Sequence, residues 1–177
     1  MSLSNVCMVM DLEGFFLNKI FYPREIGYVS LTENWINSYR FKLNHLVQKL
    51  SEKDWKTVNY CKKYVHGLTL KCLPWEKDLY QVENLRDLIK NAYCLSKKKN
   101  RNIVAYKGGQ VEKEILDELE IPCIDLEDFG CSRYDELPTS MVRDCGYHIQ
   151  MNESIHCPIK ECVAFANWIE QQLGYEK

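Results

Sequence analysis

Residues 6–13 read Val-Cys-Met-Val-Met-Asp-Leu-Glu, an apolar run that ends in two carboxylates. The run Val6–Met10 has the length and composition of a buried strand. Asp11 and Glu13 lie two residues apart, and side chains two apart on a strand point to the same face. Adjacent carboxylates repel each other unless a divalent cation neutralises them, as in two-metal phosphoryl chemistry. Taken alone, the same pair is more often a solvated strand end than a metal site.

The pattern around this run predicts the fold class. Two further strands are expected at Arg24–Leu31 and Ser38–Leu43, which would make an antiparallel meander with the first. The mixed stretch Leu46–Tyr64 predicts a short helix and a loop. Helices and strands then alternate: helix Trp75–Ala92, strand Asn102–Tyr106, helix Gln110–Leu119, strand Pro122–Leu126 and helix Ile159–Leu173. This order predicts one α/β domain over residues 1–177, with a mixed sheet and helices on both faces.

Composition narrows the class of partner and compartment. The 177 residues carry a net charge of −2, so a nucleic-acid partner would have to be bound through a local basic patch or through metal ions. No apolar run is long enough to span a bilayer, and residues 1–5 do not resemble a secretory signal. Nine cysteines, an odd number, favour a reducing intracellular compartment, cytoplasmic or nuclear, over a disulfide scaffold.

A second group of metal-ligand residues lies in the last third of the chain. Cys145 and His148 form a C-x2-H pair, Cys157 follows, and Cys131 precedes them. Zinc takes four such ligands tetrahedrally, and it would organise a segment, residues 127–151, that shows little regular pattern. Cys131, Cys145, His148 and Cys157 are therefore predicted to hold a structural zinc ion. The alternative is that they are ordinary buried thiols and a surface histidine.

Several segments together resemble the DEDDh 3′→5′ exonucleases. The similar segments, in family order, are Asp11-Leu12-Glu13, Glu25-Ile26-Gly27-Tyr28-Val29, Val65-His66-Gly67-Leu68-Thr69, the strand 103–107 leading to Glu112, and an H-x4-E pattern from His156 to Glu161. The resemblance covers about residues 6–170 and implies a ribonuclease H-like fold. It also implies a nuclease acting on RNA or single-stranded DNA.

The resemblance implies a role for each matched residue. Asp11, Glu13, Glu112 and Glu161 would hold two Mg²⁺ or Mn²⁺ ions, and His156 would act as the general base. The family has aspartate where this chain has Glu112 and Glu161, which puts catalysis in question because two-metal sites need accurate carboxylate placement. Asp117 is a substitute for Glu112 in this alignment. Both glutamates are also ordinary helix-start acids, favoured by the helix dipole.

The cysteine and histidine pattern resembles a second family, the Maelstrom domain. That domain has the same fold and binds zinc through a Glu-Cys-His-Cys set in place of the catalytic acids. Its C-x2-H pair, followed nine residues later by a cysteine, is similar to Cys145, His148 and Cys157. The resemblance makes Glu13 a rival to Cys131 as the fourth ligand. His156 is then either base or ligand.

Two functions follow as hypotheses. The first is a metal-dependent exonuclease with a structural zinc site. The second is a catalytically degenerate, zinc-stabilised domain that binds RNA or a protein partner without cleavage. A third, broader alternative is a plain scaffold domain.

Overall fold

The fold is built on a six-stranded mixed sheet. A computed structural model of the chain describes residues 1–138, 145–151 and 156–174, the last three residues of the second range by backbone only. The strand order is β4-β3-β2-β1-β5-β6. The pairs β1/β2 and β2/β3 are antiparallel, whereas β1/β5, β5/β6 and β3/β4 are parallel. The strands are β1 Val6–Leu17, β2 Ile20–Ser30, β3 Ile36–Phe41, β4 Leu79–Tyr80, β5 Ile103–Tyr106 and β6 Cys123–Asp125.

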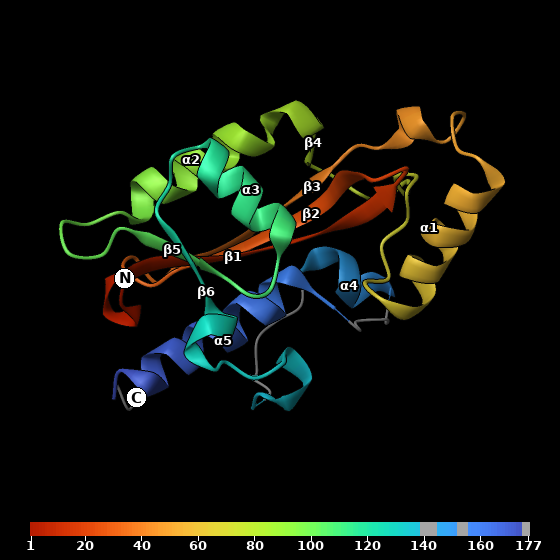
Figure 1. The fold of residues 1–177 in the computed structure, drawn as a ribbon. Helices are drawn as coiled ribbons and strands as arrows, with labels where there is room; N and C mark the ends of the chain where they lie inside the picture. Colours follow the sequence, from red (N-terminus) through yellow and green to blue (C-terminus); the bar gives the residue numbers. More distant parts are fainter. Residues whose placement is uncertain (139–144, 152–155, 175–177) are drawn as a thin grey trace.

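Helices cover both faces of this sheet, which confirms the α/β class. The antiparallel pairing of β1 with β2 and of β2 with β3 confirms the predicted meander. The helices are α1 Glu52–Tyr64, α2 Leu85–Ser96, α3 Gln110–Glu118, α4 Gly146–Met151 and α5 Pro158–Gln172. Figure 1 shows α2 and α3 on one face and α5 on the other. No helix in the described ranges is both long enough and apolar enough to cross a membrane.

Each face of the sheet has its own apolar core. Met8, Met10 and Leu12 of β1 pack with α2 and α3. Val6 and Val9 pack with α5 through residues such as Phe165 and Ile169. A third cluster, which contains Phe15 and Leu17, joins the far end of β1 to α1. The sheet is therefore buried from both sides, as its apolar strands require.

The first strand is longer than the sequence predicted. It runs past Asp11 and Glu13 to Leu17 and turns back through Asn18 and Lys19, both with positive φ (49° and 66°). Two successive positive φ values are typical of the tight turns that match strand twist in hairpins. The register between β1 and β2 shifts between Glu13 and Gly14, so a bulge lies next to the acidic pair.

The helix predicted over Trp75–Ala92 was wrong in its first half. Leu79 and Tyr80 pair with β3 as the short strand β4, and Val82–Asn84 forms a 3-10 turn, so α2 begins only at Leu85. Strand pairing with β3 overrides the helical spacing of the apolar residues here. The segment predicted to be irregular contains the 3-10 turns Leu126–Phe129 and Tyr134–Glu136 and the helix α4, while residues 139–144 lie outside the described ranges.

Candidate functional site

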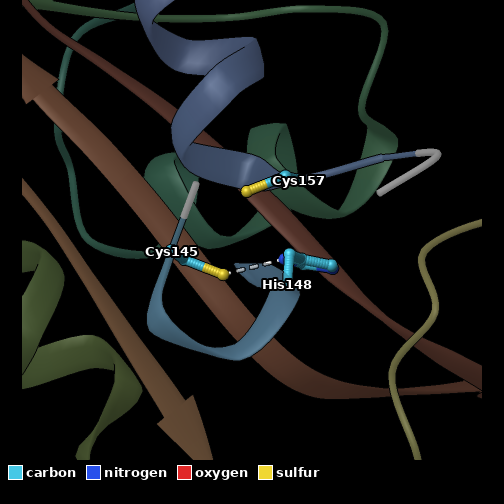
Figure 2. Close-up of side chains that lie close together, drawn as sticks. All are labelled: Cys145, His148 and Cys157. Carbon is cyan, nitrogen blue, oxygen red and sulfur yellow. Dashed lines mark hydrogen bonds between the residues drawn. The ribbon is translucent and has the colours of Figure 1, made fainter. Parts of the chain in front are cut away.

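Three of the four predicted zinc ligands come together in the folded chain. Cys145 lies just before α4, His148 lies within it, and Cys157 is the residue before α5. All three are buried, and their ligand atoms lie within 4.8 Å of one another. Figure 2 shows the two thiols and the imidazole converging, with Cys145 Sγ 2.8 Å from His148 Nδ1. The spacing of three residues on one helical turn explains why Cys145 and His148 share a face.

The hydrogen bonds of His148 orient it for metal binding. Its Nε2 lies 2.8 Å from the carbonyl oxygen of His66, which can only accept, so Nε2 carries the proton. Nδ1 is therefore the nitrogen directed at the thiols, as in the histidine–carbonyl arrangements that fix metal-ligating imidazoles. Against the effect of burial, hydrogen bonding to Cys157 raises the pKa of His148 to about 9, so a metal ion would bind at Nδ1 by displacing a proton. The hydrogen bond from Cys145 lowers the pKa of Cys157 to about 4, against the effect of burial. A thiolate is the form that binds zinc.

Glu25 of β2 lies beside this group, although the sequence motifs gave it no role as a ligand. Its side chain is fully buried, and Oε2 lies 3.9 Å from His148 Nδ1. Among the described residues its carboxylate oxygens have no hydrogen-bond partner at standard geometry, although the Cys145 thiol is close enough to lower its pKa. Burial raises the pKa of Glu25 to about 7. A buried, unpaired carboxylate is costly. Two thiols, an imidazole and a carboxylate are a donor set that suits tetrahedral zinc, so these residues fit the ion.

Cys131 does not belong to the group of Cys145, His148 and Cys157. It is buried in the other core, with Leu126 and Val163 under α5. Burial raises the pKa of its thiol to about 11, which disfavours the thiolate. Glu13, the rival fourth ligand, lies instead with His156 and Glu161. The structure therefore separates Cys131, Glu13 and His156, the candidates for the fourth ligand, from this group and brings Glu25 close to His148 instead.

The predicted catalytic acids lie close enough together to influence one another's charge, with contributions from β1, α3 and α5. Asp11 and Glu13 come from β1, while Glu112 and Glu161 lie in the first turns of α3 and α5. The ligand atoms of Glu13, His156 and Glu161 lie within 4.8 Å of one another. Burial, and next the charge of Glu161, raise the pKa of Asp11 well above its ordinary value and that of Glu13 to about 8.

One oxygen of Asp11 is a candidate ligand for a cation. Asp11 Oδ2 is buried and has no hydrogen-bond partner among the described residues. Carboxylates in this condition either take up a proton or bind a metal ion. Charge repulsion from Glu161, Glu13 and Glu112 adds to the effect of burial on its pKa. The cluster therefore has the donor chemistry that Mg²⁺ or Mn²⁺ requires.

The structure also decides between the two candidates on α3. Glu112 is buried, and its Oε1 accepts a hydrogen bond of 3.1 Å from the backbone N–H of Leu12, between the two acids of β1. Asp117 instead forms an ion pair with Lys113 on the exposed side of α3. Glu112 is thus the α3 acid that reaches the cluster, although one of its oxygens is already bound to the backbone.

His156 is tied to Glu161. Its Nδ1 lies 2.5 Å from Glu161 Oε1, and this hydrogen bond raises the pKa of the imidazole. The ring is 41% exposed, whereas the Glu161 side chain is 10% exposed. Among the described residues none hydrogen-bonds Nε2, so that nitrogen is available to a solvent molecule or a ligand.

The chain matches no protein-family model and no curated protein. Function therefore has to follow from the geometry of the two clusters.

A hollow of about 390 Å³ adjoins the carboxylate cluster. Glu13 and Glu112 line it, together with Phe16 and Phe21 of the β1/β2 hairpin and Gly109 at the start of α3. Its walls are mostly apolar and aromatic, and two acids stand at its edge. A hollow with this lining can take a planar apolar group while a charged group of the same ligand meets the acids.

His66 joins the two clusters. Its Nδ1 accepts a hydrogen bond from the backbone N–H of Leu68, so Nε2–H donates to the carbonyl of Gly14, at 3.0 Å. Burial lowers the pKa of His66 to about 4, which keeps the ring neutral. Because the His66 carbonyl accepts from His148, this segment connects the bulge beside Glu13 with the candidate zinc ligands. His66 belongs to a segment that resembles the exonucleases, but the sequence pattern alone indicated no role for it.

Proposed function

We propose that the chain is a metal-dependent nuclease of the DEDDh 3′→5′ exonuclease type that acts on RNA or single-stranded DNA, with a separate structural zinc site. The observation that carries this proposal is the buried carboxylate cluster with its unpaired Asp11 oxygen. The antiparallel β1–β3 followed by parallel β5 and β6 supports a ribonuclease H-like fold. The hollow beside Glu13 supports a nucleotide-sized ligand.

The chain's own residues would divide the work of hydrolysis. Asp11, Glu13, Glu112 and Glu161 would hold Mg²⁺ or Mn²⁺, which supplies a charge to offset that of the phosphodiester and lowers the pKa of bound water. Without such ions four acids would repel a phosphate. His156, held through Nδ1 by Glu161, offers Nε2 to take a proton from the attacking water. The zinc group at Glu25, Cys145, His148 and Cys157 would stabilise the fold.

A nuclease assay tests this proposal directly. Purified protein would be incubated with 5′-labelled single-stranded RNA and DNA in Mn²⁺. Asp11→Ala should abolish shortening of the strand and should not lower the thermal unfolding midpoint, because the substitution removes an acid that burial and neighbouring carboxylates destabilise. Asp117→Ala, which removes an exposed acid of α3, is the matched control and should cleave normally. Equal cleavage by wild type and Asp11→Ala would place the activity elsewhere.

A second function is favoured by a different observation. Glu25, Cys145, His148 and Cys157 complete a Glu-Cys-His-Cys set, the pattern of the Maelstrom resemblance. One carboxylate oxygen of Glu112 already accepts a hydrogen bond from the Leu12 N–H, and one oxygen of Glu161 is already hydrogen-bonded to His156. These features support a zinc-stabilised domain that binds RNA or protein without cleavage. A preparation that contains one zinc ion per chain, binds single-stranded RNA and never cleaves it would favour this alternative.

A further inference from the structure

The sheet has a free edge beside β3. Strand β4 pairs only with Arg40 and Phe41, at the end of β3. The chain reaches β4 through Asp78, whose positive φ of 54° turns it onto the edge at that point. Residues 36–39 have no strand partner on this side in the described part of the chain. Half of an edge strand is therefore paired and half is open.

The hydrogen bonds show which backbone groups face outward. The N–H of Ser30 in β2 donates to the carbonyl of Trp35 at 2.9 Å. In an antiparallel pair the residues that bond to the partner alternate, so Asn37 and Tyr39 also point toward β2. The N–H and C=O groups of Ile36 and Ser38 then point away from the sheet. The hydrogen bond of Ser38 agrees with this, because its N–H donates to the side-chain oxygen of Asn37 and not to a carbonyl of β2.

An apolar hollow lies on the α2 side of this edge. Its volume is about 290 Å³, and its lining includes Tyr28, Trp35, Tyr39, Leu88 and Leu95. The Tyr28 and Trp35 rings meet edge to face with centroids 5.2 Å apart, so the aromatic wall is fixed. Leu95 is 66% exposed. An exposed leucine beside aromatic rings can pack against an apolar side chain supplied by a ligand.

A cationic hollow of similar size lies at the same edge. Its volume is also about 290 Å³, and Ser38, Arg40, Lys77 and Asp78 are among its lining residues. Arg40 donates no hydrogen bond to any described residue, and its buried Nε lies 3.6 Å from Glu76. That carboxylate is already held by two shorter bonds from Arg24.

The charge of this second hollow favours an anionic ligand. Lys77 is exposed and forms no ion pair with any described residue, and Asp78 supplies the one carboxylate among the residues that line this hollow. Arg40 also lies beside the buried carboxylates of Glu76 and Glu25, which line the protein side rather than the hollow. A guanidinium with unused donors binds a carboxylate in a planar, two-pronged geometry.

We propose that the open edge of β3 binds an extended peptide of a partner protein as an added strand. The peptide's main chain would pair with Ile36 and Ser38, displacing the Asn37 amide. Side chains of a strand alternate between the two faces. One apolar or aromatic side chain would enter the hollow of Trp35, and the next, an acidic one, would reach Arg40 and Lys77.

Two observations favour this occupant over others. The edge offers backbone donors and acceptors at the spacing of a strand, which a nucleic acid cannot match. A second copy of the chain paired edge to edge would bring the cations of each cationic hollow to the same interface, and like charges there disfavour association. A peptide with alternating apolar and acidic residues meets both hollows.

The test uses a defined probe. A fluorescein-labelled octapeptide with alternating phenylalanine and glutamate at its centre would be titrated with the full chain, and anisotropy recorded. Ser38→Pro removes the outward N–H at an edge position where proline is tolerated, and it should weaken binding about tenfold or more. Lys77→Glu should weaken it about fivefold, whereas Lys62→Glu, on exposed α1 surface, should not change it. A phenylalanine–lysine octapeptide should not bind.

Amide exchange gives a measurement that needs no variant. In wild-type protein the probe should slow exchange of the Ser38 amide and leave that of Asn37 unchanged, because Asn37 already bonds to β2. Unchanged Ser38 exchange, or equal binding by Ser38→Pro with an intact circular dichroism spectrum, would overturn the proposal. So would tighter, Lys77-dependent binding of oligouridine at this edge, or a dimer in sedimentation that Ser38→Pro abolishes. None of these outcomes depends on nuclease activity.

Discussion

Replacement of Glu25 by glutamine should have opposite effects with and without zinc. In metal-free protein, burial raises the pKa of Glu25 from 4.5 to about 7. The folded state therefore prefers the neutral acid, and stability falls as pH rises from about 4.5 through 7. At pH 8 the loss amounts to about 3 kcal/mol, since one pKa unit corresponds to about 1.4 kcal/mol. Glutamine resembles the neutral acid in shape, so metal-free Glu25→Gln should be more stable than wild type by up to about 3 kcal/mol.

With zinc bound, the carboxylate is needed. An amide oxygen is a weaker ligand, and loss of a ligand should reduce zinc affinity by at least about 10- to 100-fold. At saturating zinc this lowers the stabilisation by binding by about 1.4–2.7 kcal/mol. The free energy of unfolding would be measured by guanidinium titration and tryptophan fluorescence at pH 8 under reducing conditions, with EDTA or with excess zinc. Glu52→Gln, an exposed acid at the start of α1, is the control.

The two conditions separate the explanations. If zinc stabilises Glu25→Gln as much as it stabilises wild type, Glu25 is not a ligand and the fourth position belongs to water or another group. If EDTA leaves wild type and variant equally stable, the buried carboxylate is not charged at pH 8 and the electrostatic reasoning fails.

Three further predictions concern the packing and charges around the sites. Gly27→Ala should destabilise the fold by about 2–3 kcal/mol, because its Cβ would lie 2.6 Å from the backbone where α5 begins. Gly146→Ala should be near neutral in thermal unfolding, because its Cβ would meet no described atom within 4 Å outside its own helix and chain neighbours. Glu76→Gln should cost about 3–5 kcal/mol in urea titrations, since it breaks the buried ion pair in which Arg24 Nη2 donates to both carboxylate oxygens of Glu76. The free energy of unfolding of the metal-free protein should also fall from pH 4.5 to 8, because burial raises the pKa of Glu13 to about 8. Bound Mn²⁺ should remove this pH dependence, and a dependence that persists in Mn²⁺ would mean that Glu13 is not a ligand.

The sequence predicted those elements whose stability depends on local pattern. The apolar runs of β5 and β6 and the one-sided helices α3 and α5 lie within a residue or two of their expected bounds. Elements fixed by contacts between distant residues were misjudged. The far half of β1 exists because it pairs with β2 through a turn that lacks a glycine, and β4 exists because β3 offers an edge.

The same distinction explains the site. The pair Cys145 and His148 could be predicted, because three-residue spacing places both on one face of a helix. Cys131 was expected with them because it is near in sequence, yet the chain takes its thiol into the core under α5. Glu25 lies 120 residues before Cys145 and reaches it only through the register of β2 against β1. No local pattern carries that register, since it depends on the bulge at Glu13 and Gly14.

The two clusters share a boundary. Glu13 and Glu25 are opposite each other across β1 and β2, and His156 and Cys157 are consecutive residues. A metal ion bound to Cys157 would therefore fix the backbone of His156, whose ring must stay beside Glu161 to act as the proposed general base. Asp11, in the middle of the sheet, does not depend on that support. Loss of zinc should consequently disturb the histidine before it disturbs the strand acids. Cys157→Ser should weaken cleavage through the position of His156 while Mn²⁺ binding at Asp11 persists. Equal loss of cleavage and of Mn²⁺ binding would mean instead that zinc supports the whole sheet.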